Sequence, residues 1–238
     1  MLVIRSTLFY LGYVPMTIVL SLLFITLFPL LPARGRYNFA AMWCGFVLHW
    51  LRISCGVRWQ ITGQENLNGH SAVVLANHQS SWETLSFYRL FFPIAPILKK
   101  ELLRIPFWGW ALRLLEPIAI DRSKPRDAGK SILKQGVQRL RDGYSVIIFP
   151  EGTRAHVDEV KHFSRGGAKL AVAAGVPIIP IALRTGHCWP PRQFLKYPGT
   201  ITLEIGQPMA SDGGDANALT DAAEQWVRQR VALMAEPD

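Results

Sequence analysis

Residues 72–83, AVVLANHQSSWE, join an apolar run to a polar turn and to the start of an amphipathic stretch. The run Val73–Ala76 is short, apolar and partly β-branched, which predicts a buried strand. The stretch Ser81–Phe91 that follows the turn has the periodicity of a helix. Because open α/β folds bind ligands where a buried strand ends, the polar residues between these two elements form the first candidate site.

The same alternation of short apolar runs and amphipathic stretches continues from residue 57 to the C-terminal region. The predicted strands are Val57–Ile61, Ala72–Ala76, Pro96–Lys99, Pro117–Asp121, Ser145–Phe149, Ile178–Leu183 and Ile201–Ile205. The predicted helices are Ser81–Phe91, Arg126–Arg141, Arg165–Ala174 and Ala216–Leu233. This alternation predicts an α/β fold, a layered domain with a largely buried mixed sheet flanked by helices.

The N-terminal region predicts a hydrophobic helical membrane anchor. Residues 6–33 form a run of 28 residues without a charge, with Arg5 before it and Arg34 and Arg36 after it. About 20 apolar residues are enough to cross a hydrocarbon core about 30 Å thick. The run is too long for the apolar part of a cleaved secretory signal. Because proline breaks or begins helices, Pro15 predicts that the strongest helical run is Met16–Phe28.

A second segment, Phe39–Ile53, mixes apolar residues with polar ones and predicts a helix at the membrane interface. Two membrane arrangements are open, one spanning helix or two helices within one leaflet, beside the third possibility of a buried helix in a soluble protein. We expect residues 1–55 to be the anchor and residues 56–238 to be the catalytic domain. If the apolar run spans the membrane, the arginines after it predict a cytoplasmic membrane location with this domain on the cytoplasmic side.

Composition excludes several classes of protein. The chain has 238 residues, is 50% hydrophobic and 18% charged, and has a mean hydropathy of +0.17, which excludes a disordered regulator. The first 60 residues contain five arginines and no acid, and the net charge is +9. The basic residues are scattered without a recognised motif, so no nucleic-acid partner is expected. Three cysteines without metal-ligand spacing predict neither a disulfide framework nor a zinc site.

His78 and Glu83 are the candidate catalytic residues. Histidine moves protons near neutral pH, and a carboxylate in the first helical turn can orient a histidine in the preceding loop. Ser80 and Glu83 also fit a capping box, and that interpretation is compatible with the first. A hydrolase that uses Ser80 or Ser81 is a weaker alternative, because the chain has no G-x-S-x-G elbow and these serines are too close to His78.

A second polar cluster, FPEGTR at residues 149–154, also follows an apolar run. Gly152 allows a close backbone approach, and the guanidinium fork of Arg154 suits phosphate oxygens, although an ordinary turn with an exposed arginine has the same pattern. Lys99, Lys100 and Arg122 either add positive charge to the opening of the same candidate site or are ordinary solvated side chains. The segment 176–180, VPIIP, has no reactive group and can only shape a pocket.

These four segments, in this order, resemble the four motif blocks of the 1-acylglycerol-3-phosphate acyltransferases. The pair His78 and Glu83 is similar to the H-x4-D signature of that superfamily, with glutamate in place of the commoner aspartate. The stretch from Lys99 to Arg122 is similar to its second block, FPEGTR to its third and VPIIP to its fourth. The resemblance covers about residues 57–206.

The resemblance implies transfer of a fatty acyl group from acyl-CoA or acyl carrier protein to the sn-2 hydroxyl of lysophosphatidic acid, giving phosphatidic acid. His78 is implied as the general base and Glu83 as the group that orients it. The implied phosphate-binding set is Arg154, Gly152, Thr153 and Glu151, with Arg122, Lys99 and Lys100, although no individual role follows for Glu151. No metal and no cofactor are implied, and the membrane bilayer is the expected partner.

Three alternatives are open at this point. Related lipid A acyltransferases also carry H-x4-E, so another lysolipid or a lipid A-type molecule is a second candidate acceptor. A membrane lysophospholipase differs by using water as the acceptor. A basic protein that only binds anionic membranes explains the N-terminal region and the charge, but it does not explain the four motifs.

Overall fold

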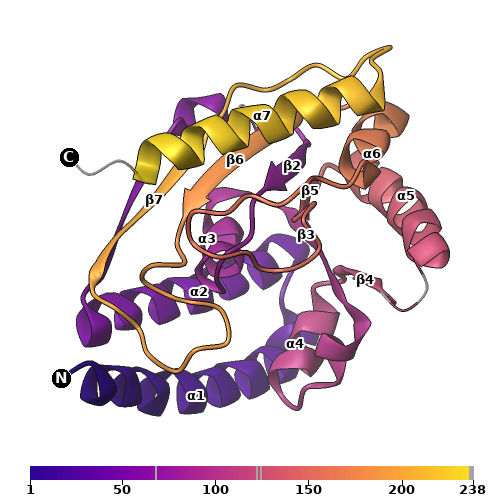
Figure 1. Cartoon of the computed structure of the whole chain (residues 1–238). Helices are drawn as coiled ribbons and strands as arrows, with labels where there is room; N and C mark the ends of the chain where they lie inside the picture. The colour runs from indigo at the N-terminus through magenta and orange to yellow at the C-terminus, as the bar shows by residue number, and fades with distance from the viewer. Residues whose placement is uncertain (68, 122, 124, 236–238) are drawn as a thin grey trace.

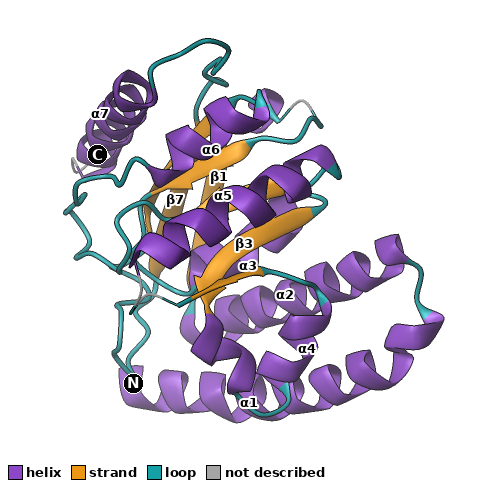
Figure 2. Ribbon diagram, turned by 90° about the vertical axis from the view of Figure 1, so that its right-hand side faces the viewer, coloured by secondary structure: helices purple, strands orange, loops and turns teal. Residues whose placement is uncertain are grey.

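The centre of the structure, a computed structural model that describes residues 1–67, 69–121, 123 and 125–235, is a seven-stranded sheet with helices on both faces (Figures 1 and 2). The strands are β1 (Val57–Thr62), β2 (Val73–Ala76), β3 (Ile94–Lys99), β4 (Ile118–Ile120), β5 (Ser145–Ile148), β6 (Ile178–Arg184) and β7 (Gly199–Ile205). All seven predicted strands are present, with their ends shifted by at most two residues.

The sheet is mixed, as predicted, in the order β1-β7-β6-β2-β5-β3-β4. Strands β6, β2, β5, β3 and β4 are parallel to their neighbours in this series, β7 is antiparallel to β6, and β1 is parallel to β7. The carboxyl ends of the five parallel strands therefore lie at one edge of the sheet. The polar segments that follow β2 and β5 meet at this edge.

The helices are α1 (Leu2–Leu27), α2 (Ala33–Cys55), α3 (Trp82–Leu90), α4 (Trp108–Leu114), α5 (Pro125–Arg141), α6 (Gly166–Ala174) and α7 (Ala216–Ala235). The four helices predicted between residues 81 and 233 are confirmed. Helix α4 was not among the predicted helices, because seven residues are too few to establish a helical period.

The alternation of side chains along β2 explains how this strand is buried on both faces. Val74 and Ala76 belong to the apolar cluster that contains side chains of α2 and α3, whereas Val73 and Leu75 belong to the cluster with α5, α6 and α7. All four side chains are fully buried. The sheet is thus the middle of three layers, and the segment after β2 leaves the core at a fixed position.

The N-terminal region is a hairpin of two helices that packs beside the sheet (Figure 2). The indole Nε1 of Trp50 in α2 donates a hydrogen bond of 3.0 Å to the carbonyl oxygen of Phe9 in α1. Gly12 faces the same indole, where a Cβ atom would lie only 2.3 Å from Nε1. Buried residues of the hairpin and of the sheet form one continuous cluster, so the hairpin is part of the core.

The prediction that Pro15 breaks or begins a helix is wrong, because α1 continues through it. Packing holds the helix on both sides of the proline. Before it, Phe9 accepts the hydrogen bond from Trp50, and after it the rings of Phe24 and Phe39 lie 5.2 Å apart. Apolar packing along a long hairpin outweighs the loss of one backbone hydrogen bond.

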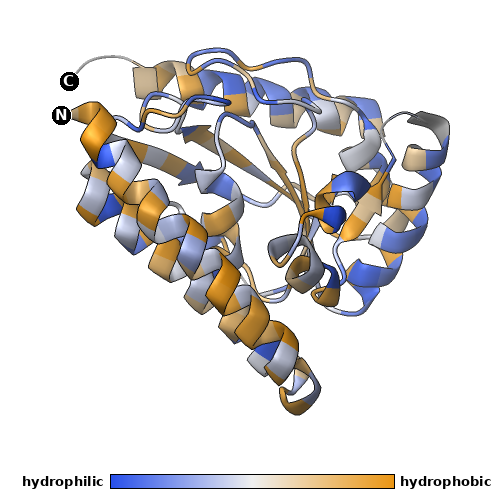
Figure 3. Cartoon of the chain, turned by 90° about the horizontal axis from the view of Figure 1, so that it is seen from below, coloured by the Kyte–Doolittle hydropathy of each residue, from blue (hydrophilic) through white to orange (hydrophobic). Residues whose placement is uncertain are grey.

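The outer surface of α1 is apolar, as expected for a membrane anchor (Figure 3). Within the described residues, the segment Leu2–Leu30 is the one helical segment long and apolar enough to cross a membrane, and 17% of its most apolar window is buried in the protein. Exposed side chains on it include Leu8, Leu11, Val19, Leu22 and Leu23. Helix α2 also extends beyond the predicted Phe39–Ile53 at both ends.

Candidate active site

His78 and Glu83 meet at the carboxyl end of β2, as the sequence predicts. His78 lies in the loop after the strand, Glu83 lies in the first turn of α3, and His78 Nδ1 is 3.1 Å from Glu83 Oε2. The Glu83 side chain is fully buried, whereas that of His78 is 15% exposed. Because Nδ1 is bound to the carboxylate, Nε2 is the ring nitrogen left to exchange a proton with a substrate.

The second oxygen of Glu83 holds the loop in place. Glu83 Oε1 accepts hydrogen bonds from the amides of Gln79 at 3.0 Å and Ser80 at 2.7 Å, and from the Thr185 hydroxyl at 2.5 Å. A single carboxylate thus binds the start of the helix with one oxygen and His78 with the other. The capping interpretation and the catalytic interpretation of Glu83 both fit this geometry.

The two serines of the motif have other partners. Ser80 is fully buried, and its hydroxyl oxygen accepts a hydrogen bond of 3.0 Å from the amide of Trp82. The hydroxyl oxygen of Ser81 accepts one of 3.0 Å from Arg154 Nη2. A serine nucleophile must be hydrogen-bonded to its base, so this geometry does not support the hydrolase alternative.

Side chains on either side of His78 attach its loop to β6 and to the segment after it. Asn77 is buried and exchanges two hydrogen bonds of 2.9 Å with the backbone of Leu183. Gln79 Oε1 accepts from the amides of Thr185 at 2.9 Å and Gly186 at 3.1 Å. The polar residues around His78 therefore fix its backbone, which limits the freedom of the imidazole.

The FPEGTR turn holds the backbone of His78 from the other side. The His78 amide donates to Glu151 Oε1 at 3.2 Å, and the Ala155 amide donates to the His78 carbonyl oxygen at 2.7 Å. The imidazole ring stacks on the Phe149 ring with centroids 4.0 Å apart. The first and second polar clusters of the sequence thus form one unit around this histidine.

Glu151 is a positioning residue in this geometry. Burial, helped by the nearby Glu83 carboxylate, raises the pKa of its carboxyl to about 8, although hydrogen bonds from the amides of His78 and Lys161 act in the opposite direction. Glu151 therefore retains its proton at neutral pH to a large extent. Its contact with the His78 amide gives it a positioning role here, and its predicted contact with phosphate stays a prediction.

Gly152 closes the turn of the FPEGTR segment. Gly152 has φ +71°, a left-handed conformation that side chains other than glycine rarely adopt. Its amide donates to the Phe149 carbonyl oxygen at 3.1 Å, which closes the turn, and Gly152 and Thr153 are both exposed. These observations give Gly152 a conformational role in the turn, and phosphate binding by Gly152 and Thr153 stays a prediction.

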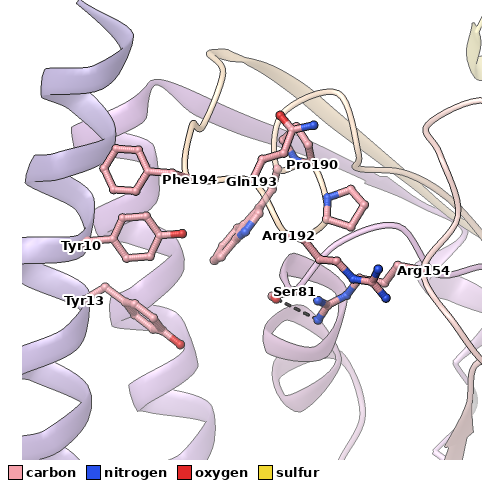
Figure 4. A pocket seen from close by; sticks show the side chains of 10 residues that line it. Tyr10, Tyr13, Ser81, Arg154, Pro190, Arg192, Gln193 and Phe194 are labelled. Carbon is pink, nitrogen blue, oxygen red and sulfur yellow. Dashed lines mark hydrogen bonds between the residues drawn. The ribbon is translucent and has the colours of Figure 1, made fainter.

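Arg154 lies at a cavity of about 370 Å³ between α1 and the loop 186–198 (Figure 4). Beside its contact with Ser81, its Nε atom is buried and has no hydrogen-bond partner among the described residues. The residues that line the cavity are Tyr10, Tyr13, Ser81, Arg154, Trp189, Pro190, Pro191, Arg192, Gln193 and Phe194. The guanidinium of Arg154 lines this cavity and is suited to an anionic ligand.

The lysines of the predicted phosphate-binding set lie farther along the same sheet edge. Lys99 ends β3 and is exposed. Lys100 Nζ is 2.5 Å from Asp121 Oδ2, and this ion pair holds the pKa of the Asp121 carboxyl well below its usual value. Arg122 lies outside the described residues. The structure therefore brings together His78, Glu83, Glu151 and Arg154, and it pairs Lys100 with a carboxylate.

Comparison with known proteins identifies the family. An acyltransferase family model matches residues 58–184. A 1-acyl-sn-glycerol-3-phosphate acyltransferase of Pseudomonas aeruginosa is 45% identical over 233 residues, which cover 96% of this chain and 91% of that protein. The chain belongs to the acyltransferase family. It is therefore an enzyme, and the alternative of a protein that only binds membranes is excluded.

Two further similarities agree with this family. The human 1-acyl-sn-glycerol-3-phosphate acyltransferase alpha is 31% identical over 222 residues, which cover 90% of this chain and 75% of the human protein. The crystal structure of the 1-acyl-sn-glycerophosphate acyltransferase PlsC from Thermotoga maritima matches with a TM-score of 0.83 and 25% identity, over 98% of this chain and 96% of that one. The predicted resemblance to the 1-acylglycerol-3-phosphate acyltransferase family is confirmed.

Thr185 and Arg192 are two residues of this acyltransferase site that the sequence did not reveal. Thr185 donates to Glu83 across 102 residues of chain, and no motif surrounds it. Its position one residue after β6 is the available signal, because β6 and β2 end at the same edge. Arg192 lies in a loop whose position only tertiary packing determines.

Proposed function

We propose that this acyltransferase moves a fatty acyl group from a thioester to the sn-2 hydroxyl of 1-acyl-sn-glycerol 3-phosphate, which gives phosphatidic acid. The contact of 3.1 Å between His78 and a fully buried Glu83 is the observation that carries the proposal. The names of the P. aeruginosa and human relatives support the choice of acceptor.

In the proposed reaction, His78 Nε2 removes the proton from the acceptor hydroxyl while the hydroxyl oxygen attacks the thioester carbonyl carbon. Glu83 stabilises the imidazolium that forms and keeps the ring in one orientation. The tetrahedral intermediate then collapses, the carbon–sulfur bond breaks, and the thiolate takes the proton from His78. The products are an ester and a free thiol, and the step needs no metal because the thioester is already activated.

The donor in this proposal is a fatty acyl thioester of coenzyme A or of acyl carrier protein. Both donors carry the same thioester group, so the pair of His78 and Glu83, here called the dyad, acts on both in the same way. Contacts far from the thioester decide which donor binds. Arg154, at the cavity beside the dyad, is the proposed ligand for the acceptor phosphate. Lys99, at the end of β3, is proposed as a further basic residue of the same edge. Arg122 lies outside the described residues and is proposed as a phosphate ligand from its motif alone.

We also propose that residues 1–55 anchor the protein in one leaflet of the cytoplasmic membrane, with catalytic residues 56–238 on the cytoplasmic side. The hairpin is attached to the body near both ends. The Ser6 hydroxyl oxygen accepts a hydrogen bond of 2.9 Å from the Lys196 amide, and the Tyr37 hydroxyl donates to the Leu115 carbonyl oxygen at 3.2 Å. A hairpin that crossed the bilayer would have to leave these contacts, which favours the arrangement within one leaflet.

Mass spectrometry of the products tests the proposed function. Purified protein in lipid vesicles receives lysophosphatidic acid with either long-chain acyl-CoA or acyl carrier protein charged with the same chain. We expect phosphatidic acid with at least one donor. Free fatty acid without phosphatidic acid would identify a lysophospholipase, and product only with another lysolipid or a lipid A precursor would identify another acceptor.

A further inference from the structure

The cavity between α1 and the loop 186–198 has two chemically different walls (Figure 4). Arg154 and Arg192 reach toward one another on one side, and Tyr10 and Tyr13 of α1 form part of the other. No aspartate or glutamate is among the described residues that line it. Two guanidinium groups that share a cavity without a carboxylate repel each other, and a bound anion removes this repulsion.

Arg192 has an unusual backbone and no partner for its charge. Its φ angle is 60°, in the left-handed region that costs free energy for a residue other than glycine. Its side chain is exposed and has no hydrogen bond or ion pair among the described residues. The two residues before it, Pro190 and Pro191, restrict the chain that leads to this conformation.

Lys196 fixes the loop that carries Arg192. Its side chain is fully buried, and Nζ donates to the carbonyl oxygens of Gln193 and Phe194 at 2.9 Å each. The same ammonium group lies 5.1 Å from the centroid of the Tyr10 ring. The loop is thus folded around a buried cation and attached to α1, so Arg192 is held beside the cavity by a defined structure.

The cavity adjoins the catalytic dyad. Ser81, which lines it, is two residues before Glu83, and Arg154 is directly followed by Ala155, whose amide binds the His78 carbonyl oxygen at 2.7 Å. A ligand whose anionic group lies between the two arginines can therefore extend toward the dyad. The aromatic wall of α1 continues into the apolar outer surface of that helix.

We propose that Arg192 and Arg154 together bind the phosphate of the acceptor, and that this cavity is the head-group site of the lysolipid. The assignment rests on the proposed function. A phosphate monoester carries nearly two negative charges and three acceptor oxygens, which match two guanidinium forks. The aromatic wall covers the glycerol end, and the acyl chain leaves along α1 toward the bilayer.

Steady-state kinetics of Arg192 variants test the assignment. Arg192→Gln removes the charge at similar length, Arg192→Lys keeps the charge without the fork, and Arg192→Gly also relieves the left-handed backbone. Arg141→Gln is the matched control, because Arg141 is an exposed arginine at the end of α5, which leads to the opposite edge of the sheet. The Michaelis constants for lysophosphatidic acid, acyl-CoA and acyl carrier protein are measured separately.

We expect Arg192→Gln and Arg192→Gly to raise the KM for lysophosphatidic acid about tenfold or more while the KM for either donor stays unchanged. Arg192→Lys should show a smaller increase, and Arg141→Gln none. The melting temperature of Arg192→Gly should not fall, since glycine accepts the backbone conformation.

Three results would overturn the assignment. Equal behaviour of Arg192→Gln and Arg141→Gln in an active enzyme would remove Arg192 from the phosphate site and leave the proposed function intact. A raised KM for acyl-CoA alone would show that the pair binds a phosphate of the donor. An inactive wild-type enzyme would instead contradict the proposed function, and the head-group assignment would fall with it.

Discussion

The dyad and the neighbouring cavity lie at the same sheet edge, but their polar groups are satisfied to opposite degrees. Both oxygens of Glu83 are bonded, one to His78 and the other to three donors. In the cavity, Arg154 Nε and the Arg192 side chain have no partner among the described residues.

The difference between the two regions corresponds to their proposed tasks. A general base works best when its orientation is fixed before the substrate arrives, so the protein itself supplies its contacts. A binding site must leave contacts open for the ligand to complete. Changes in the dyad should therefore lower kcat, and changes in the cavity should raise the KM of the acceptor.

The largest effect is expected for Glu83→Ala. Without the carboxylate, the imidazole loses both its orientation and the group that stabilises its positive charge, so kcat should fall by about 10²- to 10⁴-fold. Glu83→Asp should give an intermediate rate, since it keeps the charge but is one methylene shorter. Kinetics of both variants at saturating acceptor provide the measurement. If kcat fell as far in the aspartate variant as in the alanine variant, the length of the side chain would matter more than its charge.

Arg154→Gln should act on binding. Removal of the guanidinium takes away charge-assisted hydrogen bonds to the phosphate, which should raise the KM for lysophosphatidic acid by about 10- to 100-fold with a smaller change in kcat. Initial rates over a range of acceptor concentrations measure this change. If only the KM for the donor moved, the phosphate would have to bind elsewhere.

A smaller effect on kcat is expected for Thr185→Val, which removes one of the three donors to Glu83 Oε1 at nearly constant volume. We expect a fall of about fivefold to tenfold in kcat, corresponding to about 1 kcal/mol, with an unchanged acceptor KM. Parallel melting curves control for a general loss of stability. An unchanged kcat would show that the two backbone amides alone hold the carboxylate.

Glu151→Gln should change the pH dependence of stability more than the rate. The folded-state pKa of Glu151 is raised to about 8 from an ordinary value near 4.5. Between these pH values only the unfolded chain loses the proton, so the wild-type free energy of unfolding falls as pH rises, by up to about 1.4 kcal/mol per pH unit. This contribution is complete below pH 4.5 and is lost by about pH 8.

Because glutamine cannot ionise, the difference in unfolding free energy between the wild type and Glu151→Gln should decrease steadily from pH 5 to pH 8. Denaturant unfolding in the same detergent at several pH values gives this difference. A difference independent of pH would mean that the carboxyl is ionised in the folded protein, and its role as a neutral positioning group would have to be abandoned.

The predictable parts of this molecule are those encoded by neighbouring residues. The burial of β2 follows from four consecutive apolar residues, and the dyad follows from a histidine and an acid five positions apart. Thr185 and Ser81 reach their partners across 102 and 73 residues, and no local pattern encodes such contacts.

Two residues with special backbone properties, Pro15 and Gly152, show where sequence reasoning stops. The continuous helix through Pro15 depends on the packing of α2, which lies later in the chain. The role of Gly152 depends on which carbonyl its amide meets once the turn has folded. Residue type indicated a special backbone position in both cases, but only the tertiary environment determined its consequence.

The rate of phosphatidic acid formation by His78→Ala tests the central claim most directly. Wild type and variant are compared in the same vesicles with lysophosphatidic acid and the donor that the wild type uses, and circular dichroism confirms that both are folded. If His78 is the base, the variant should be slower by about 10²- to 10⁴-fold with an unchanged fold. Turnover at the wild-type rate in a folded variant would contradict the mechanism.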